Sequence, residues 1–98
     1  MTTLTLTSIP TILGVSISAD TLSVELSDGR TISAPIAWYP RLQHGSEDER
    51  ARHEIIGDGH GIHWPDLDED ISAENLVLGQ PSGESQNSFG KWLASRQA

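Results

Sequence analysis

Cysteine is absent from the 98 residues, and aromatic residues make up only 5% of the chain. Without cysteine the protein has no disulfide scaffold, no thiol nucleophile and no thiolate metal site. Basic residues are also scarce: six Lys and Arg stand against 14 Asp and Glu, which gives a net charge of −8. Because nucleic-acid binding requires Lys and Arg near the phosphates, this charge argues against direct contact with nucleic acid.

Long apolar runs are missing as well. The longest extends over four residues, whereas a membrane-spanning helix needs about 20. Residues 1–6 lack the basic start and the continuous apolar run of a signal peptide. We therefore expect a cytoplasmic protein that makes no membrane contact. A chain of this length holds a single domain.

The acidic residues are concentrated in the middle of the chain. Residues 44–74 contain ten Asp and Glu against Arg50 and Arg52, so this segment carries the whole net charge and the remainder is neutral. Such a field favours a basic protein partner, or mimicry of a nucleic acid within the basic groove of a protein. The alternative is a solvated acidic face that only keeps the protein soluble.

Alternating apolar residues predict three strands between residues 12 and 36. Asp28-Gly29 is a strong hairpin signal, because glycine accepts the positive φ of a tight turn. Pro35 cannot donate a backbone hydrogen bond, so the third strand should lie at an edge or end there. We predict an antiparallel meander with one apolar face. That face is formed by Leu13, Val15 and Ile17, then Leu22, Val24 and Leu26, then Ile32, Ala34 and Ile36.

Capping residues predict short helices after the meander. Pro40 fits the first turn of a helix or turn within residues 37–42. Ser46 and Glu49 form a capping box, which predicts a helix over about residues 47–54. Ser72 as N-cap and Gly79 as C-cap bound a helix over residues 73–78.

The chain end predicts one more helix. Phe89, Trp92 and Leu93 lie at positions i, i+3 and i+4, the spacing of a small amphipathic helix, with Ser88 as its cap. Residues 81–85 have the composition of a linker.

Between the helices, residues 55–64 form a second extended stretch that Gly57-Asp58-Gly59 interrupts, and residues 66–70 form a polar connection. These elements predict an α+β fold: the three-stranded meander and a further strand pair near residues 55–64, covered by short helices. Residues 12–79 make up the single domain. Residues 1–11 are an N-terminal arm or edge strand, and residues 80–98 are a linker with the C-terminal helix.

A histidine cluster raises the question of a metal site. His60 and His63 lie near His53 and Asp58 in the sequence. On an extended chain, however, residues i and i+3 point to opposite faces, so we predict no metal site. The segment from Asp66 to Asp70 begins like a calcium loop, but the position that requires glycine is Ile71 and the one that requires glutamate is Val77.

Known catalytic motifs are also absent. The sequence has neither a phosphate-binding glycine loop nor a nucleophile elbow. We therefore expect no cofactor, no catalytic residue and no enzymatic activity. Trp38, Tyr39 and Trp64 are the largest apolar groups, and they form either the core or a partly exposed binding patch.

The segments 30–42, 49–51 and 55–72 resemble the bacterial domain-of-unknown-function 2442 family. The hallmark is Gly-x-x-Ile-His-Trp-Pro-x-x-Asp-Glu-Asp-Ile-Ser, here Gly59 to Ser72. The resemblance covers residues 12–79. It implies a small α+β domain, and it implies genes arranged like a toxin–antitoxin pair, with no established catalytic residue. Motif residues can also serve the fold, with an aspartate capping the helix that begins at Ala73 and with Trp64 packed beneath it.

The leading hypothesis is therefore a non-enzymatic acidic module, an antitoxin-like partner of a basic protein. A phage or mobile-element inhibitor that mimics nucleic acid is the first alternative. A metal protein or enzyme using His53, Asp58, His60 and His63 is the second. A homodimer through an edge strand or the C-terminal helix is a further option. The expected partner-binding residues are Trp38, Tyr39, His63, Trp64, Asp66, Asp68, Glu69 and Asp70.

Overall fold

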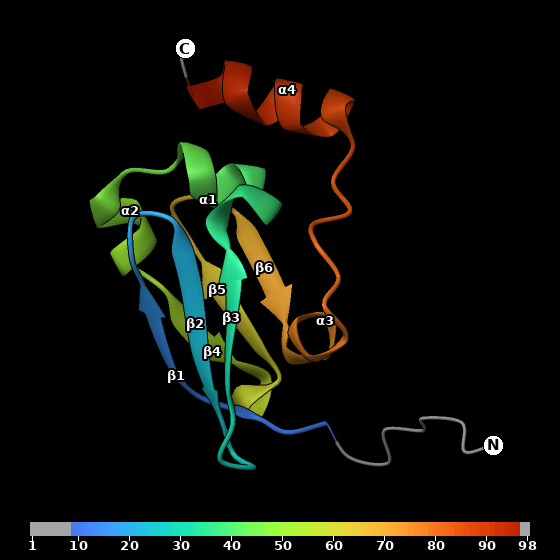
Figure 1. The fold of residues 1–98 in the computed structure, drawn as a ribbon. Helices are drawn as coiled ribbons and strands as arrows, with labels where there is room; N and C mark the ends of the chain where they lie inside the picture. Colours follow the sequence, from blue (N-terminus) through green and yellow to red (C-terminus); the bar gives the residue numbers. More distant parts are fainter. Residues whose placement is uncertain (1–8, 97–98) are drawn as a thin grey trace, which may run out of the picture.

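The computed structural model describes residues 9–96 and contains two three-stranded antiparallel sheets (Figure 1). The first sheet has the order β1 (Ile12–Ile17), β2 (Thr21–Leu26) and β3 (Thr31–Pro35). This confirms the meander, and β3 is an edge strand that ends at Pro35. An arm or strand is expected over residues 1–11, and residues 1–8 of it lie outside the described residues.

One side chain of the meander was placed on the wrong face. Leu13 was expected on the apolar face but is 65% exposed, whereas Ile12 is only 3% exposed. The pairing of β1 with β2 shifts between Ile12 and Gly14. A bulge adds one residue to a strand and breaks its alternation. Ile12 therefore turns inward, and Val15 and Ile17 resume the inward face after the shift.

The second sheet contains one strand more than the predicted pair. It has the order β4 (Glu54–Ile56), β5 (Gly61–Trp64) and β6 (Glu69–Ser72). The end of the expected polar connection is thus the start of β6, where Glu69 pairs with Trp64 and Ile71 pairs with Ile62. Backbone hydrogen bonds hold this strand whatever its side chains are. A single inward apolar residue in an acidic segment gives no detectable alternation.

The helices follow their predicted caps closely. The 3-10 helix η1 (Ile36–Trp38) leads into α1 (Pro40–His44), with proline in its first turn. Helix α2 (Glu47–Ala51) has the predicted capping box. It ends three residues earlier than expected, because Arg52 leaves the helical conformation and β4 begins at Glu54.

The remaining helices lie in the second half of the chain. The 3-10 turn η2 (Gly57–Gly59) joins β4 to β5. Helix α3 (Ala73–Leu78) has Ser72 as its cap, so the cap is this serine and not an aspartate, and left-handed Gly79 ends it as predicted. Helix α4 (Gln86–Arg96) begins earlier than expected. Its first turn is capped by the Ser85 hydroxyl, which accepts from the Ser88 N–H at 3.0 Å, and not by Ser88 itself.

The core lies between the two sheets, one of which lies behind the other in Figure 1. Trp64 is fully buried there, and its indole N–H donates to the Arg50 carbonyl in α2 at 3.0 Å. Helices α1 and α3 add Leu42, Ala73 and Leu76 to the same cluster. The largest fully buried side chains are those of Trp64, Leu22, Ile36, Leu42, Ile62, Leu67 and Val24.

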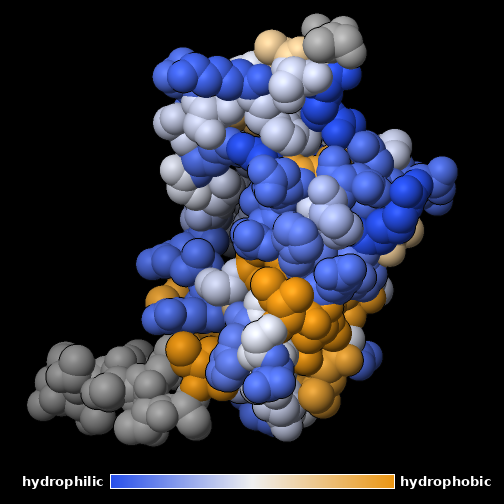
Figure 2. All heavy atoms as spheres, turned by 180° about the vertical axis from the view of Figure 1, so that it is seen from behind, coloured by the Kyte–Doolittle hydropathy of each residue, from blue (hydrophilic) through white to orange (hydrophobic). Residues whose placement is uncertain are grey.

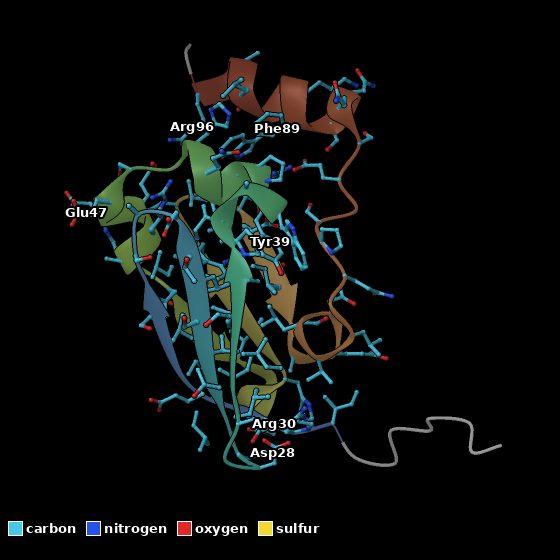
Figure 3. All side chains as sticks on the ribbon, in the orientation of Figure 1. Asp28, Arg30, Tyr39, Glu47, Phe89 and Arg96 are labelled. Carbon is cyan, nitrogen blue, oxygen red and sulfur yellow. The ribbon has the colours of Figure 1, made fainter. Side chains whose placement is uncertain are left out.

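Helix α4 has no buried residue and is held by contacts at its surface. Arg96 bonds to Glu49 of α2 at 2.7 Å, and Phe89 packs against His44 with ring centroids 5.2 Å apart. Figure 3 shows Phe89 and Arg96 on the side of α4 that faces α1 and α2. Among residues 9–96, none of the helices combines the length and the apolar content that crossing a bilayer requires.

Gly59 allows the two sheets to approach each other. Its φ is +92°, and a Cβ at this position would lie 2.8 Å from the Cβ of Thr11, just before β1. The sequence signal for a bend at Gly57-Asp58-Gly59 therefore also marks a close contact between η2 and the first sheet.

We expect Gly59→Ala to destabilise the fold more than Gly29→Ala. Both glycines have a φ near +90°, but an added Cβ meets no atom within 4 Å at Gly29. The backbone strain, about 1–3 kcal/mol, is therefore common to both variants. The clash at Gly59 should add about 1–3 kcal/mol. Urea unfolding followed by tryptophan fluorescence measures the difference, and equal losses would contradict this packing.

Candidate functional site

A polar groove of about 420 Å³ runs beside β6, under the segment that joins α3 to α4. Its walls come from the η1–α1 junction, from the turn before β6 and from the α3–α4 segment. We call it the β6 groove. It is lined by Tyr39, Arg41, residues 68–71, Asn75, residues 80–84 and Ser88.

Local geometry of the chain places Glu69 in this groove. Asp68 takes a left-handed conformation with φ 51°, which aspartate tolerates better than most residues. The turn buries Leu67 and starts β6 at Glu69. Glu69 pairs directly with Trp64, so the two side chains share the inner face of the sheet.

One oxygen of Glu69 lacks a partner. Oε1 accepts from the Asp70 N–H at 3.1 Å, whereas Oε2 is buried and has no hydrogen-bond partner among residues 9–96. Burial raises the pKa of Glu69 and outweighs the nearby charge of Arg41. An ionised Glu69 is therefore costly to the fold as long as no cation meets it.

Tyr39 presents a second polar atom of this kind. The residue is 3% exposed and lines the groove, and its hydroxyl finds no partner in the described part of the chain. Burial, and then the negative charge of Glu69, raise the pKa of Tyr39. Tyr39 and Glu69 both line the β6 groove, so each of the two unpartnered atoms belongs to a lining residue.

The one cation that lines the groove is already bound. The Arg41 Nε donates to Glu84 Oε1 at 2.8 Å, and Nη1 donates to the Asp68 carbonyl at 2.9 Å. Nη2 also donates to Glu84. The bonds to Glu84 raise the pKa of Arg41 and lower that of Glu84. The charge of Arg41 is thus balanced mainly by Glu84, not by Glu69.

The structure divides the aromatic candidates. Trp64 belongs to the core, where a partner cannot reach it, and Tyr39 is also buried although it lines the groove. Trp38 in η1 is 38% exposed. Of the two interpretations of these residues, the core therefore applies to Tyr39 and Trp64.

The charged candidates also separate. Tyr39, Asp68, Glu69 and Asp70 meet at the β6 groove. His63 lies outside it on the outer face of β5, where its Nδ1 is 2.6 Å from Asp70 Oδ1. Asp66 forms an ion pair of 3.1 Å with Arg52.

A metal site or enzyme built on the histidine cluster requires the side chains of His53, Asp58, His60 and His63 to converge. The structure does not bring them together. His60 ends η2, His63 lies on β5, and His53 packs against the Trp64 ring at 6.1 Å. Over the described range, no three His, Asp or Glu side chains are placed to share a metal ion.

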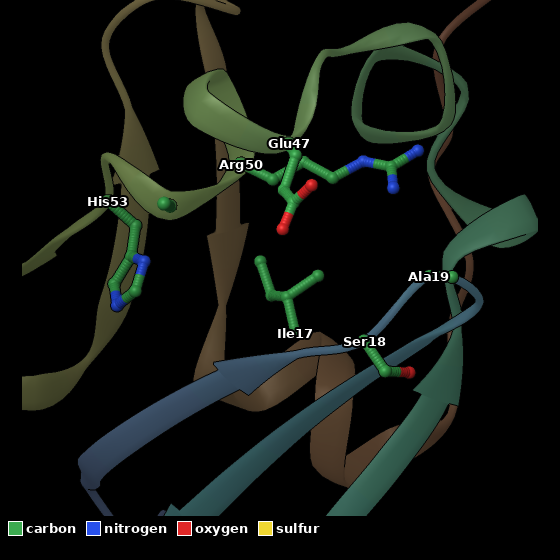
Figure 4. A pocket seen from close by; sticks show the side chains of 7 residues that line it. Ile17, Ser18, Ala19, Glu47, Arg50 and His53 are labelled. Carbon is green, nitrogen blue, oxygen red and sulfur yellow. The ribbon is translucent and has the colours of Figure 1, made fainter.

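His53 lines a different hollow, of about 490 Å³, between the β1–β2 turn and α2 (Figure 4). Glu47 points into it, whereas the Arg50 guanidinium extends away and donates to the carbonyls of Leu42 and Gln43. Its lining also includes Ile17 and Ala51, so polar groups do not converge there as they do in the β6 groove.

The edge strands of the two sheets bear on self-association. Strands β1 and β3 of the first sheet and β4 and β6 of the second each pair on one side only. Exposed apolar residues mark β1 and β4. Leu13, Ile55 and Ile56 on these strands are exposed, and hydrophobic residues gather on the lower part of the rear face in Figure 2. A homodimer through an edge strand stays a prediction. The C-terminal helix is less suited to one, because Phe89 and Trp92 contact its own chain.

Sequence reasoning missed Arg41, Asn75 and Glu84 as parts of the site. Arg41 and Glu84 are 43 positions apart, and no local pattern links them. The segment that carries Glu84 has the composition of a linker, which predicts no specific contact.

The fold and the groove define a small two-sheet α+β domain with an acidic recess. The chain belongs to the family described as Protein of unknown function (DUF2442), whose model matches residues 12–82. This confirms the resemblance drawn from the motif. Helix α4 lies beyond the matched residues. Among curated proteins, none matches the chain.

Two solved structures share the fold. One is a protein of unknown function from Rhodospirillum rubrum, 29% identical, with 79% of this chain and 95% of that chain covered and a TM-score of 0.67. The other is an uncharacterised protein from Chromobacterium violaceum, 20% identical, with 88% and 75% covered and a TM-score of 0.63. The second likeness shows the fold alone.

We expect Glu69→Gln to stabilise the protein at neutral pH. Because the folded-state pKa of Glu69 is raised above 4.5, the folded state binds more protons than the unfolded state as the pH rises through that window. Stability is therefore lost as the pH rises, and Gln avoids this loss. The melting temperature at pH 7 should rise by a few degrees, and the gain should vanish below about pH 4.

Glu49→Gln supplies the opposite reference in the same melting experiment. Arg96 and the Ser46 N–H lower the pKa of Glu49 to about 2, so its stabilisation is present above pH 4.5 and is lost as the pH falls. Gln keeps the capping box but loses the ion pair, which should cost about 0.5–1 kcal/mol at pH 7. If Glu69→Gln and Glu49→Gln shift the melting temperature at pH 7 in the same direction, the pKa of Glu69 is not raised as stated.

Proposed function

We propose that this protein is a non-enzymatic acidic module that binds a basic surface of another protein. The observation that carries the proposal is that most of its basic side chains bond to other groups of the same molecule. Five of the six Lys and Arg side chains are occupied within the molecule. The pairs are Arg30 with Asp28, Arg41 with Glu84, Arg52 with Asp66 and Arg96 with Glu49, while Arg50 donates to two carbonyls.

The carboxylates that remain set the character of the surface. Six of those in the acidic segment take part in no ion pair within residues 9–96: Glu47, Asp48, Glu54, Asp58, Glu69 and Glu74. Uncompensated charge of one sign steers an oppositely charged protein towards the molecule. The arginines hold the fold together, and the negative field is left for a partner.

An antitoxin-like role in a toxin–antitoxin-type pair is the specific form of this proposal. A protein that neutralises another by occupying its surface needs shape and charge but no reaction chemistry. The family resemblance supports this role through its gene arrangement. The nucleic-acid mimic is the competing version, and it differs in its target: a basic groove that otherwise holds nucleic acid.

Crosslinking in the native source followed by reconstitution with the purified captured protein tests the module. We expect a basic protein, bound stoichiometrically, whose association rate falls about tenfold or more between low and moderate salt. At the same salt concentration, the combined variant Glu47→Gln, Asp48→Asn, Glu54→Gln should associate more slowly than the wild type.

Asp28→Asn is the matched control, because Asp28 is ion-paired with Arg30 at the hairpin tip (Figure 3). It should leave the association rate unchanged. An acidic partner, or association that does not respond to salt, would contradict the proposal. A partner released by competing nucleic acid would favour the mimic.

A further inference from the structure

Two buried polar atoms in the β6 groove have no partner. They are the Tyr39 hydroxyl and Glu69 Oε2, in a part of the chain where residues 9–96 offer neither a hydrogen bond. Buried polar atoms are nearly always bonded in native proteins, because an unmet bond costs free energy. Two such atoms on residues that line one recess point to a bound group that supplies the missing bonds once the side chains turn towards it.

The charge of the recess selects a cation. Four acidic residues line it, Asp68, Glu69, Asp70 and Glu84, against Arg41 as the single basic residue. The Arg41 guanidinium bonds to Glu84 and to the Asp68 carbonyl. The Asp70 carboxylate points to the outer face of the sheet, where it meets His63, and the Asp68 side chain is largely exposed. Among the four, Glu69 is the partly buried side chain that forms no ion pair.

The bond that Glu69 already makes favours one kind of cation. A guanidinium binds best to both oxygens of one carboxylate, in a planar fork. Oε1 of Glu69 already accepts from the Asp70 N–H, so Oε2 is the oxygen without a bond. An ammonium group is a compact charge with three donors. It needs only one carboxylate oxygen, and it has donors left for a second acceptor such as the Tyr39 oxygen.

We propose that the β6 groove binds the ammonium group of a lysine side chain on the partner protein. Ile71 and Pro81 line the same groove, and a lysine stem packs on apolar surface while its charged end reaches a polar one. This inference rests on the proposed function and adds the residue type that the partner inserts.

Titration with the capped peptide acetyl-Ala-Lys-Ala-amide, followed by amide NMR, tests the pocket. We expect saturable shifts at Glu69 and Asp70 in the millimolar range, typical of one partly exposed ion pair. The peptide with norleucine in place of lysine should cause no such shifts, and the arginine peptide should bind at least about threefold more weakly.

Glu69→Gln and Tyr39→Phe should each weaken lysine-peptide binding by about fivefold or more. Glu25→Gln changes the net charge as Glu69→Gln does, but Glu25 lies in β2, outside the groove. Its affinity should equal that of the wild type. Melting curves confirm that each variant is folded, and the two groove variants check each other.

Equal weakening by Glu25→Gln, or binding of the norleucine peptide as tight as that of the lysine peptide, would overturn the lysine site. A captured basic partner whose association is slowed by the combined variant Glu47→Gln, Asp48→Asn, Glu54→Gln but not by Glu69→Gln would also overturn the lysine site. That result would leave the proposed function intact. Saturable, Glu69-dependent lysine binding supports the site. If no protein partner is then captured, the proposed function fails separately.

Discussion

The Arg41 guanidinium joins three parts of the chain that are far apart in sequence. It bonds to Glu84 in the α3–α4 segment and to the carbonyl of Asp68 before β6, and it lies 5.1 Å from the ring centre of Trp92 in α4. The contacts with Glu84 and Asp68 form a wall of the β6 groove. Because Arg41 pairs with Glu84, its charge does not offset the burial that raises the pKa of Glu69. The stability of the C-terminal segment and the charge of the groove thus depend on one side chain.

Other arginines are also bound to groups within the molecule. Arg50 donates to the last carbonyls of α1, Arg96 holds α4 to α2, and Arg52 pairs with Asp66. With a net charge of −8, the chain has few cations, and the fold uses most of them. An acidic surface is therefore a structural consequence of how the arginines are placed. A basic protein partner is the kind of molecule that such a surface favours.

Local signals predicted much of this fold. The Asp28-Gly29 turn, the Ser46 capping box and the Ser72 to Gly79 caps each depend on neighbouring residues, so the sequence determines them well. The bulge at Leu13 and strand β6 depend on pairing with distant strands, which alternation in one segment does not reveal. Tyr39 and Glu69 were named from the sequence as contact residues. Their juxtaposition with Arg41 and Glu84 required the folded chain.

The central claim is that Glu69 is a buried carboxylate that awaits a cation. Carbon-13 NMR titration of the Glu69 carboxyl group, in the free protein and with saturating lysine peptide, tests it most directly. The account predicts a pKa above the ordinary 4.5 in the free protein and a lower pKa when the ammonium group is bound. A pKa below 4.5 in the free protein would show that Arg41 already neutralises Glu69, and that result would contradict the account.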